Sequence, residues 1–192
     1  MKRDEDLMWT PVKVEHIVQD QWIDFRRVDY RYPDGREFGP FYQYSRKNYS
    51  IIVPVLPDGR FLCVRQFRQG VEEVTTEFPA GGIEAAGTEY SRAGQEDALS
   101  AAQRELREET GYESDQWTHL LTVPSNATMA DNYAYVFLAQ GCRRVSSLHL
   151  DETEDLEPEI LTQGEIESLI QAGKFQQATH VMAYLLALRH GL

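Results

Sequence analysis

The chain has 192 residues, 42% of them hydrophobic and 11% aromatic, which predicts one soluble globular domain with a core of its own and room for a small appendage. The 31 acidic and 19 basic residues give a net charge of −12, which argues against the basic surface of a nucleic-acid-binding protein. The sequence has no apolar run of about 18 residues and no apolar N-terminal stretch, so we expect a cytoplasmic protein without a membrane segment.

The first quarter of the chain has the alternation and turn residues of β-strands. Residues 13–45 predict a series of strands, and a shift of apolar phase between Phe25 and Val28 indicates a β-bulge. Two apolar runs within residues 49–67 are joined by the turn sequence PDGR at 57–60, which predicts a hairpin. Because these runs are almost entirely apolar, we expect them to be central strands of a sheet.

The clearest helical pattern covers residues 97–110, where apolar side chains recur every three or four positions and Gly111 marks the end. Glu96 and Asp97 are expected in the first turn, where the helix dipole favours negative charge. The downstream pattern predicts strands at 117–123 and 132–139 and helices at 164–173 and 175–190. Strands before and after one central helix, with helices at the end, predict an α+β fold with a mixed sheet between helices.

Three glutamates crowd one side of the central helix. Glu105 and Glu109 are four positions apart and stack on one face, with Glu108 beside them. Their repulsion costs roughly a few tenths of a kcal/mol per pair, so the segment is either a solvated charged face or a cation site. Mg²⁺ and Mn²⁺ take carboxylate oxygens and would let an acidic protein receive an anionic substrate. The upstream stretch FPAGG favours the metal site, because its glycines allow the backbone to approach another group closely.

The segment from Glu96 to Tyr112 resembles the Nudix box, G-x5-E-x7-R-E-U-x-E-E-x-G-U, in which U is a bulky apolar residue. From Glu96 onward, through the stretch RELREETGY, every specified position matches. The first part departs from the pattern, because 14 residues separate Gly81 from Glu96 where the family has five. We interpret the extra residues as a lengthened loop, which costs little free energy of folding.

The resemblance implies an enzyme that hydrolyses a nucleoside diphosphate linked to another group, using divalent metals on the box helix. It implies that Glu105 and Glu109 are the main metal ligands and that Glu108 is a ligand or supports the ligands. The backbone carbonyl of Ala80 would be a further ligand. Arg104 would orient the glutamates through an ion pair, and the alternative for it is a surface arginine.

From about residue 40 to the end, the chain also resembles one branch of this family, the ADP-ribose pyrophosphatase-like enzymes. This resemblance implies a Nudix-type α/β/α sandwich with a mixed sheet over residues 49–192. It implies a small β-rich N-terminal subdomain over residues 1–48. That subdomain exchanges contacts between subunits in the branch, so we expect a homodimer.

In the same branch a glutamate from a loop beyond the box activates the attacking water. The segment DETEDLE occupies this place, with Glu152 the best positional match and Glu154 next, and the alternative is a solvated acidic loop. Arg65 and Arg68 stand where the branch often has basic residues that face the substrate or the metal helix, and Glu77 precedes the PAG turn, so these three residues could contact the diphosphate or the terminal sugar. They could equally form ion pairs at the edge of the sheet.

Together these features predict Mg²⁺-dependent hydrolysis of a nucleoside diphosphate sugar to a nucleoside monophosphate and a sugar phosphate, with Mn²⁺ as a second suitable metal. ADP-ribose is the first candidate substrate. ADP-ribose enzymes usually carry an SPG-type turn after the strand that follows the box, whereas this chain has Asn126 near that place. ADP-glucose and GDP-mannose therefore stay open, as does a non-catalytic sugar-nucleotide sensor with the same fold.

Overall fold

The computed structural model describes residues 1–84, 97–150 and 155–192. Its main feature is a seven-stranded sheet in the order β12-β5-β4-β10-β9, with β6 paired to β5 and β7 paired to β4. The strands are β4 (Tyr49–Val55), β5 (Phe61–Arg68), β6 (Glu73–Glu77), β7 (Ala80–Gly82), β9 (Gln116–Pro124), β10 (Tyr133–Gln140) and β12 (Leu156–Leu161). The sheet is mixed, because β4 runs parallel to β10 and antiparallel to β5 and β7.

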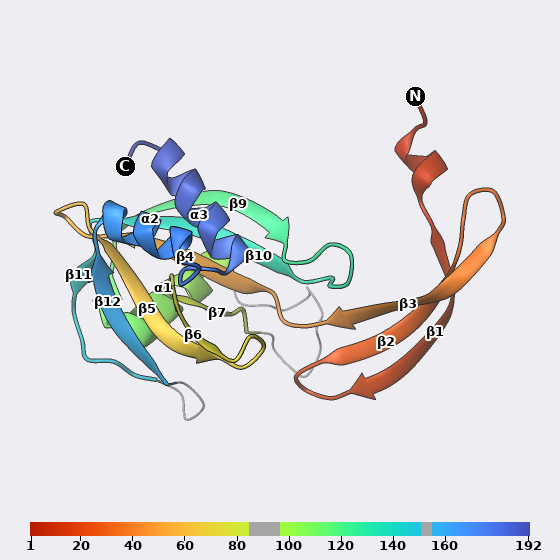
Figure 1. Ribbon diagram of the computed structural model, residues 1–192, viewed down its shortest axis with the longest axis horizontal. Coiled ribbons are helices and arrows are strands. Elements are labelled where there is room, and N and C mark those ends of the chain that lie inside the picture. Colours follow the sequence, from red (N-terminus) through yellow and green to blue (C-terminus); the bar gives the residue numbers. More distant parts are fainter. Residues whose placement is uncertain (85–96, 151–154) are drawn as a thin grey trace.

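Helices cover both faces of this sheet (Figure 1). Helix α1 (Ala98–Thr110) packs on one face, and α2 (Gln163–Gln171) and α3 (Ala178–Arg189) pack on the other. The α+β class and the mixed sheet between helices are therefore confirmed, as is the central position of β4 and β5. None of the helices in the described parts of the chain is long and apolar enough to cross a membrane.

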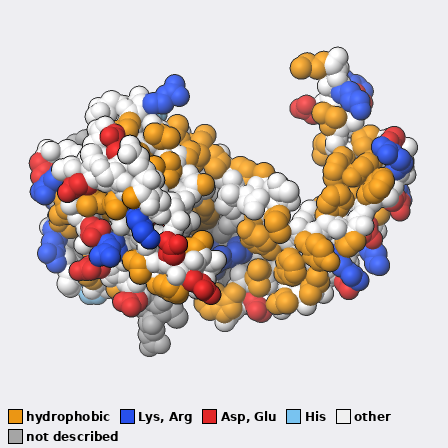
Figure 2. Space-filling model, in the orientation of Figure 1, with side chains coloured by type: hydrophobic (Ala, Val, Ile, Leu, Met, Phe, Trp, Pro, Cys, Tyr) orange, Lys and Arg blue, Asp and Glu red, His pale blue; other side chains and the backbone are white. Residues whose placement is uncertain are grey.

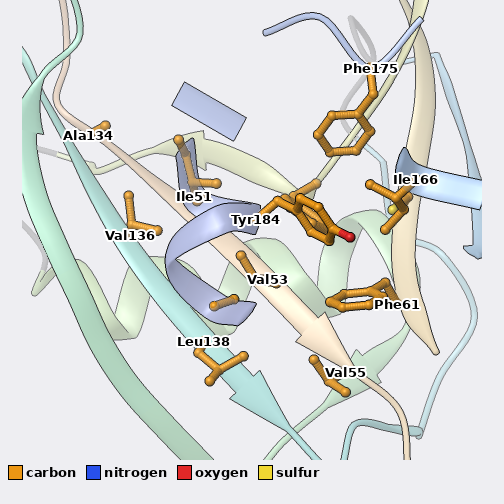
Figure 3. Close-up of a cluster of buried hydrophobic side chains, with 14 residues drawn as sticks. Ile51, Val53, Val55, Phe61, Ala134, Val136, Leu138, Ile166, Phe175 and Tyr184 are labelled. Atoms are coloured by element: carbon orange, nitrogen blue, oxygen red, sulfur yellow. The ribbon is translucent and has the colours of Figure 1, made fainter. Parts of the chain in front are cut away.

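Strand β4 supplies core residues to both helix layers, because successive side chains of a strand point to opposite faces. Ile51 and Val53 belong to the cluster that contains Tyr184 of α3, as Figure 3 shows. Ile52, between them, belongs to the cluster that contains Leu106 of α1. A strand that is buried on both faces must be apolar at nearly every position, and this explains the continuous run that predicted it.

Helix α1 begins and ends through local caps. The side chain of Asp97 accepts a hydrogen bond from the backbone N–H of Ser100 at 3.2 Å. Gly111 has the left-handed backbone that ends many helices, with φ of 76°, and its N–H donates to the carbonyl of Arg107. The predicted stop is confirmed. Asp97, however, is the N-cap rather than a first-turn residue, because its carboxylate bonds a free N–H of that turn, and Glu96 lies outside the described residues.

A separate three-stranded antiparallel sheet precedes the main sheet and extends away from it (Figure 1). Its strands are β1 (Thr10–Gln19), β2 (Asp24–Arg31) and β3 (Glu37–Ser45). The predicted irregularity between Phe25 and Val28 is present in the pairing with β1, whose register shifts between His16 and Val18, opposite Arg26 and Phe25. The pairing with β3 is regular over that stretch and shifts after Val28. Gly39 lies beside this second shift, and a Cβ there would lie 2.0 Å from Oδ1 of Asp29, so glycine leaves room for that side chain.

Short elements complete the chain. They are the 3-10 helix η1 (Asp4–Leu7) and the two-stranded pair β8 (Tyr112–Glu113) and β11 (Arg143–Arg144). The N-terminal sheet is attached to the segment before β10, where Asp131 accepts hydrogen bonds from Ser45 and Arg26 and the backbone N–H of Tyr44 donates to the carbonyl of Met129 at 2.8 Å. These polar bonds fix the sheet at its end near β3 and leave most of its surface outside the core.

Candidate active site on helix α1

The box helix places its glutamates against the sheet edge that carries β7. Ala102 and Leu106 are fully buried in the core, and this fixes the rotation of the helix. Glu105 and Glu109 are consequently buried as well, at 6% and 3% exposure. The side chain of Glu108 is 39% exposed and lies closer to solvent. Two buried carboxylates and one accessible carboxylate thus share one side of α1.

Strand β7 forms the opposite wall of this site. A Cβ at Gly81 would lie 1.9 Å from Cδ of Glu105, so only glycine leaves room for that carboxylate. The backbone N–H of Ala80 donates to Oε2 of Glu109 at 3.1 Å. Gly81 of FPAGG therefore has the role that the sequence predicted, a close approach of backbone to another group, and that group is the carboxylate of Glu105; Gly82 has no such contact.

Arg104 holds the glutamates together. Its Nη1 donates to Oε1 of Glu105 at 2.8 Å and to Oε2 of Glu108 at 2.9 Å, and its Nη2 donates to the carbonyl of Gly82 at 3.0 Å. One planar guanidinium thus bridges two carboxylates of α1 and the backbone of β7. The ion pair expected for Arg104 is present, so this residue is more than a surface arginine.

The donors at this site suit a hard divalent cation. Glu105, Glu108 and Glu109 offer only oxygen atoms, and Gly81 leaves room for the carboxylate of Glu105. Among the residues that the structure describes, no three acidic, histidine or cysteine side chains converge on one point. Mg²⁺ does not require such a cage, since it is usually held by one or two carboxylates with substrate phosphates and water. The residues present therefore fit Mg²⁺.

The other predicted site residues fall into two groups. Glu152 and Glu154 lie outside the described residues. Arg68 contacts the carboxylate of Glu77, whose side chain is fully buried and also accepts from Gln177 at 2.7 Å. A bound substrate could therefore meet this pair only through Arg68, which is one-third exposed.

Arg65 lies elsewhere on β5, where its Nη1 is 3.6 Å from Oε1 of Glu159 on β12. Its side chain is 46% exposed, so the pair is a surface ion pair of small energetic value. The structure does not bring Arg65 together with the carboxylates of α1. The ion pairs that the sequence left open are thus formed by both arginines, and contact with substrate stays a prediction.

A cleft of about 620 Å³ runs along the exposed side of α1. It is lined by Gln103, Arg104, Arg107, Glu108, Glu113, Ser114 and His149. The backbone N–H of His149 donates to the carbonyl of Glu108 at 3.0 Å, which places this histidine beside the box helix. Sequence reasoning did not single out His149, and no local pattern could have done so, because the contact joins segments about forty residues apart.

Comparison with known proteins settles the family. The model of the NUDIX domain matches residues 45–186. The chain belongs to the Nudix family. A crystal structure of an ADP compounds hydrolase has the same Nudix fold, with a TM-score of 0.76 at 22% sequence identity, over 94% of this chain and 92% of that one. The expected α/β/α sandwich is thereby confirmed.

Several relatives of this Nudix protein are similar in sequence. The methanol dehydrogenase activator of Bacillus methanolicus is 28% identical over 90% of this chain and 88% of its own length. The ADP-ribose pyrophosphatase of Bacillus subtilis is 33% identical, over 55% of this chain and 53% of the relative. The ADP-ribose pyrophosphatase of Saccharomyces cerevisiae is 36% identical, over 53% of this chain and 46% of the relative. The chain thus spans about half the length of the two pyrophosphatases, and the resemblance to their branch is confirmed.

Proposed function

We propose that this Nudix protein hydrolyses the diphosphate bond of a nucleoside diphosphate sugar in a Mg²⁺-dependent reaction, with ADP-ribose as the preferred substrate. The products would be a nucleoside monophosphate and a sugar phosphate. The observation that carries the proposal is the joint fixation of Glu105 and Glu108 by Arg104, with Glu109 held by the backbone of Ala80. Carboxylates held in this way need no reorganisation when a metal and a diphosphate bind.

The ligands of the metal would be Glu105 and Glu109, with Glu108 and the carbonyl of Ala80 completing the protein's share. When bound, Mg²⁺ supplies positive charge to the diphosphate oxygens and lowers the pKa of bound water. Arg104 keeps the carboxylates in place and itself stays paired. A loop carboxylate, Glu152 or Glu154, would take the proton of the attacking water.

Arg68 is the candidate for a direct contact with the substrate. The buried Glu77 holds the guanidinium at Nη2, and one-third of the Arg68 side chain is exposed, which leaves a ligand the donors other than the buried Nε–H. A diphosphate or a sugar hydroxyl would accept from them. Arg65 would contribute only to the surrounding positive potential, because it already pairs with Glu159 at the surface.

ADP-ribose is preferred over other nucleotide sugars because two relatives are named ADP-ribose pyrophosphatases. ADP-glucose and GDP-mannose are the alternatives. The test is a panel of these three compounds, incubated with purified protein and Mg²⁺ in ¹⁸O-labelled water and read by mass spectrometry. The position of the label identifies the phosphorus attacked, and release of no monophosphate from any compound would disprove the proposal.

A sugar-nucleotide sensor without turnover is a competing function. It predicts binding without product, and Glu109→Gln distinguishes the two. This substitution keeps the shape of the side chain and removes its charge, so an enzyme should lose turnover by about two orders of magnitude or more. A sensor would bind the nucleotide sugar as before.

A regulatory role is a second candidate function, favoured by one observation. The methanol dehydrogenase activator matches nearly the whole chain rather than half of it. Adding the purified protein to a methanol dehydrogenase and measuring its rate tests this role. Stimulation that Glu109→Gln abolishes would tie the regulation to hydrolysis, and stimulation that survives it would point to a protein contact.

We further propose that the chain is divided near residue 48 and forms a homodimer through the N-terminal sheet. Strand β1 is exposed at all ten positions, and apolar side chains gather over this sheet (Figure 2). The exposed apolar residues of the sheet and the turn between β1 and β2 are Val12, Val14, Ile17, Val18, Trp22, Phe38, Phe41 and Tyr42. So large an apolar surface is rare on a monomer and fits a second copy of the chain.

A further inference from the structure

The N-terminal end of α3 and the turn before it run beside β6 and the residue that follows this strand. The backbone N–H of Thr76 donates to the carbonyl of Lys174 at 2.9 Å. One residue further, Glu77 accepts from the side chain of Gln177 at 2.7 Å. The backbone N–H of Phe78 then donates to Nδ1 of His180 at 3.2 Å. The last two residues of β6 and Phe78 directly after them are thus bound to one segment of the helix layer that contains α3.

His180 acts in this contact as a neutral acceptor. Its side chain is buried, with 2% of the residue exposed. Burial and the nearby charge of Arg68 lower the pKa of the imidazole to about 3. At neutral pH the ring is therefore uncharged, and because Nδ1 accepts from Phe78, the ring proton is on Nε2. Without this acceptor, the backbone N–H of Phe78 would lose the hydrogen bond that it makes to His180, which is costly for a buried donor.

The same stretch of backbone continues directly into the candidate active site. After Phe78, the carbonyl of Pro79 accepts from Ile52 at 3.0 Å, and the N–H of Ala80 donates to Glu109. Gly81 then leaves room for the carboxylate of Glu105. Only Pro79 separates Phe78, whose N–H donates to His180, from Ala80, whose N–H donates to Glu109. An extended chain fixed at both ends transmits a shift at one end to the other.

We propose that His180 is a positioning residue for the carboxylates of α1. It acts through Phe78 and Ala80, and it sets the place of the β7 backbone against which Glu105 and Glu109 are held. The metal role of these carboxylates rests on the proposed function. The helix layer on one face of the sheet thus determines the geometry of a site built by the helix on the other face.

The variants His180→Leu and His180→Asn test this role. Leucine fills the space and offers no acceptor, whereas the side-chain oxygen of asparagine can take nearly the place of Nδ1. Affinity for Mn²⁺, measured by electron paramagnetic resonance without substrate, should fall about fivefold or more in His180→Leu and stay within about twofold of wild type in His180→Asn. In steady-state assays kcat should follow the same order while KM changes little.

Tyr184→Leu is the matched control, since Tyr184 is a buried α3 residue whose ring packs against Phe61 and whose hydroxyl donates to Glu167. It should lower thermal stability and leave Mn²⁺ affinity unchanged. Equal loss of Mn²⁺ affinity in this control, or wild-type affinity in folded His180→Leu, would overturn the inference. If His180→Leu does not fold, His180→Phe, which also offers no acceptor to the N–H of Phe78, replaces it with the same expectation.

Measurements of hydrolysis and of Mn²⁺ binding distinguish a failure of the proposed function from a failure of the positioning role. A wild-type protein that binds Mn²⁺ but hydrolyses no nucleotide sugar would refute the enzyme and leave the positioning role supported by the binding data. A wild-type protein that binds no Mn²⁺ would overturn both, because there would be no metal site for His180 to position.

Discussion

The carboxylate of Glu105 occupies the space in which any side chain at position 81 would lie. The ideal Cβ of residue 81 falls 1.9 Å from Cδ of Glu105 and 2.1 Å and 2.2 Å from its two oxygens. The backbone of Gly81 is not left-handed. Glycine is therefore required at this position only because it has no side chain. This contact joins the FPAGG stretch to the box helix and gives the first prediction.

Gly81→Ala should therefore displace Glu105 and lower kcat/KM for ADP-ribose by about two orders of magnitude, since misplacement by about 1 Å costs an enzyme about that much. Gly82→Ala should cause a far smaller loss, because the nearest atom to its Cβ would be Cδ of Lys47 at 3.6 Å. Initial rates with Mg²⁺, together with circular dichroism to show that both variants fold, make the comparison. Equal losses in the two variants would contradict the assignment.

Arg104→Lys should impair the enzyme without unfolding it. A single ammonium group cannot bridge Glu105, Glu108 and the carbonyl of Gly82 in the planar geometry of a guanidinium. We expect kcat to fall by roughly tenfold and the Mg²⁺ concentration for half-maximal rate to rise, because a loosened carboxylate binds metal less well.

Arg143→Lys is the control for this change. Arg143 forms an exposed pair with Asp115 outside the site, so the same substitution there should alter neither quantity. If Arg104→Lys retains wild-type kcat and Mg²⁺ dependence, the bridging role of Arg104 is wrong.

The homodimer is tested by a change on β1. Replacing Val14 and Ile17 by glutamate puts two charges on the exposed apolar surface, which should convert the dimer to a 22.1 kDa monomer in light scattering. Leu185→Glu, at an exposed position of α3, should leave the dimer intact. A wild-type chain that is monomeric at tens of micromolar would already refute the expectation.

Stability should depend on pH through His180. The folded-state pKa of about 3 lies below the unfolded-state value of 6.5, so the unfolded chain binds one more proton between these values. The free energy of unfolding therefore decreases as pH falls below 6.5, by up to about 1.4 kcal/mol per unit. In His180→Asn this contribution is missing.

Urea unfolding at about pH 7 and about pH 5 makes the comparison. Wild type should lose more free energy of unfolding than His180→Asn between these two pH values. The carboxylates titrate in both chains alike, so the difference between the two losses reports on His180. Parallel losses would show that His180 is not neutral and buried in solution.

The sequence predicted best what depends on local periodicity. The limits of α1, its stop at Gly111 and the strands β4, β5, β9 and β10 all follow from apolar spacing and turn residues, which act over a few positions. The box glutamates were recognised for the same reason, since three residues on one helical face are visible in a linear pattern. The three-stranded N-terminal sheet also agrees with its predicted strands.

Features that depend on contacts between distant segments could not be predicted. The register shift after Val28 lies where the side chain of Asp29 approaches Gly39 of the next strand. The approach of His149 to Glu108 and the bond of His180 to Phe78 likewise join remote segments. Neither histidine has a local pattern around it, so only the tertiary structure assigns it a place.

The order of strands has a consequence for how the chain folds. Strand β4 pairs on one side with β5 and β7, which follow it closely, and on the other side with β10, residues 133–140. During synthesis β4 and β5 are made before β10, so the apolar edge of β4 that pairs with β10 stays unpaired until residues 133–140 have been made. Such long-range parallel pairing is slow, and an open edge invites association with other chains. Refolding yield should accordingly fall steeply with rising protein concentration.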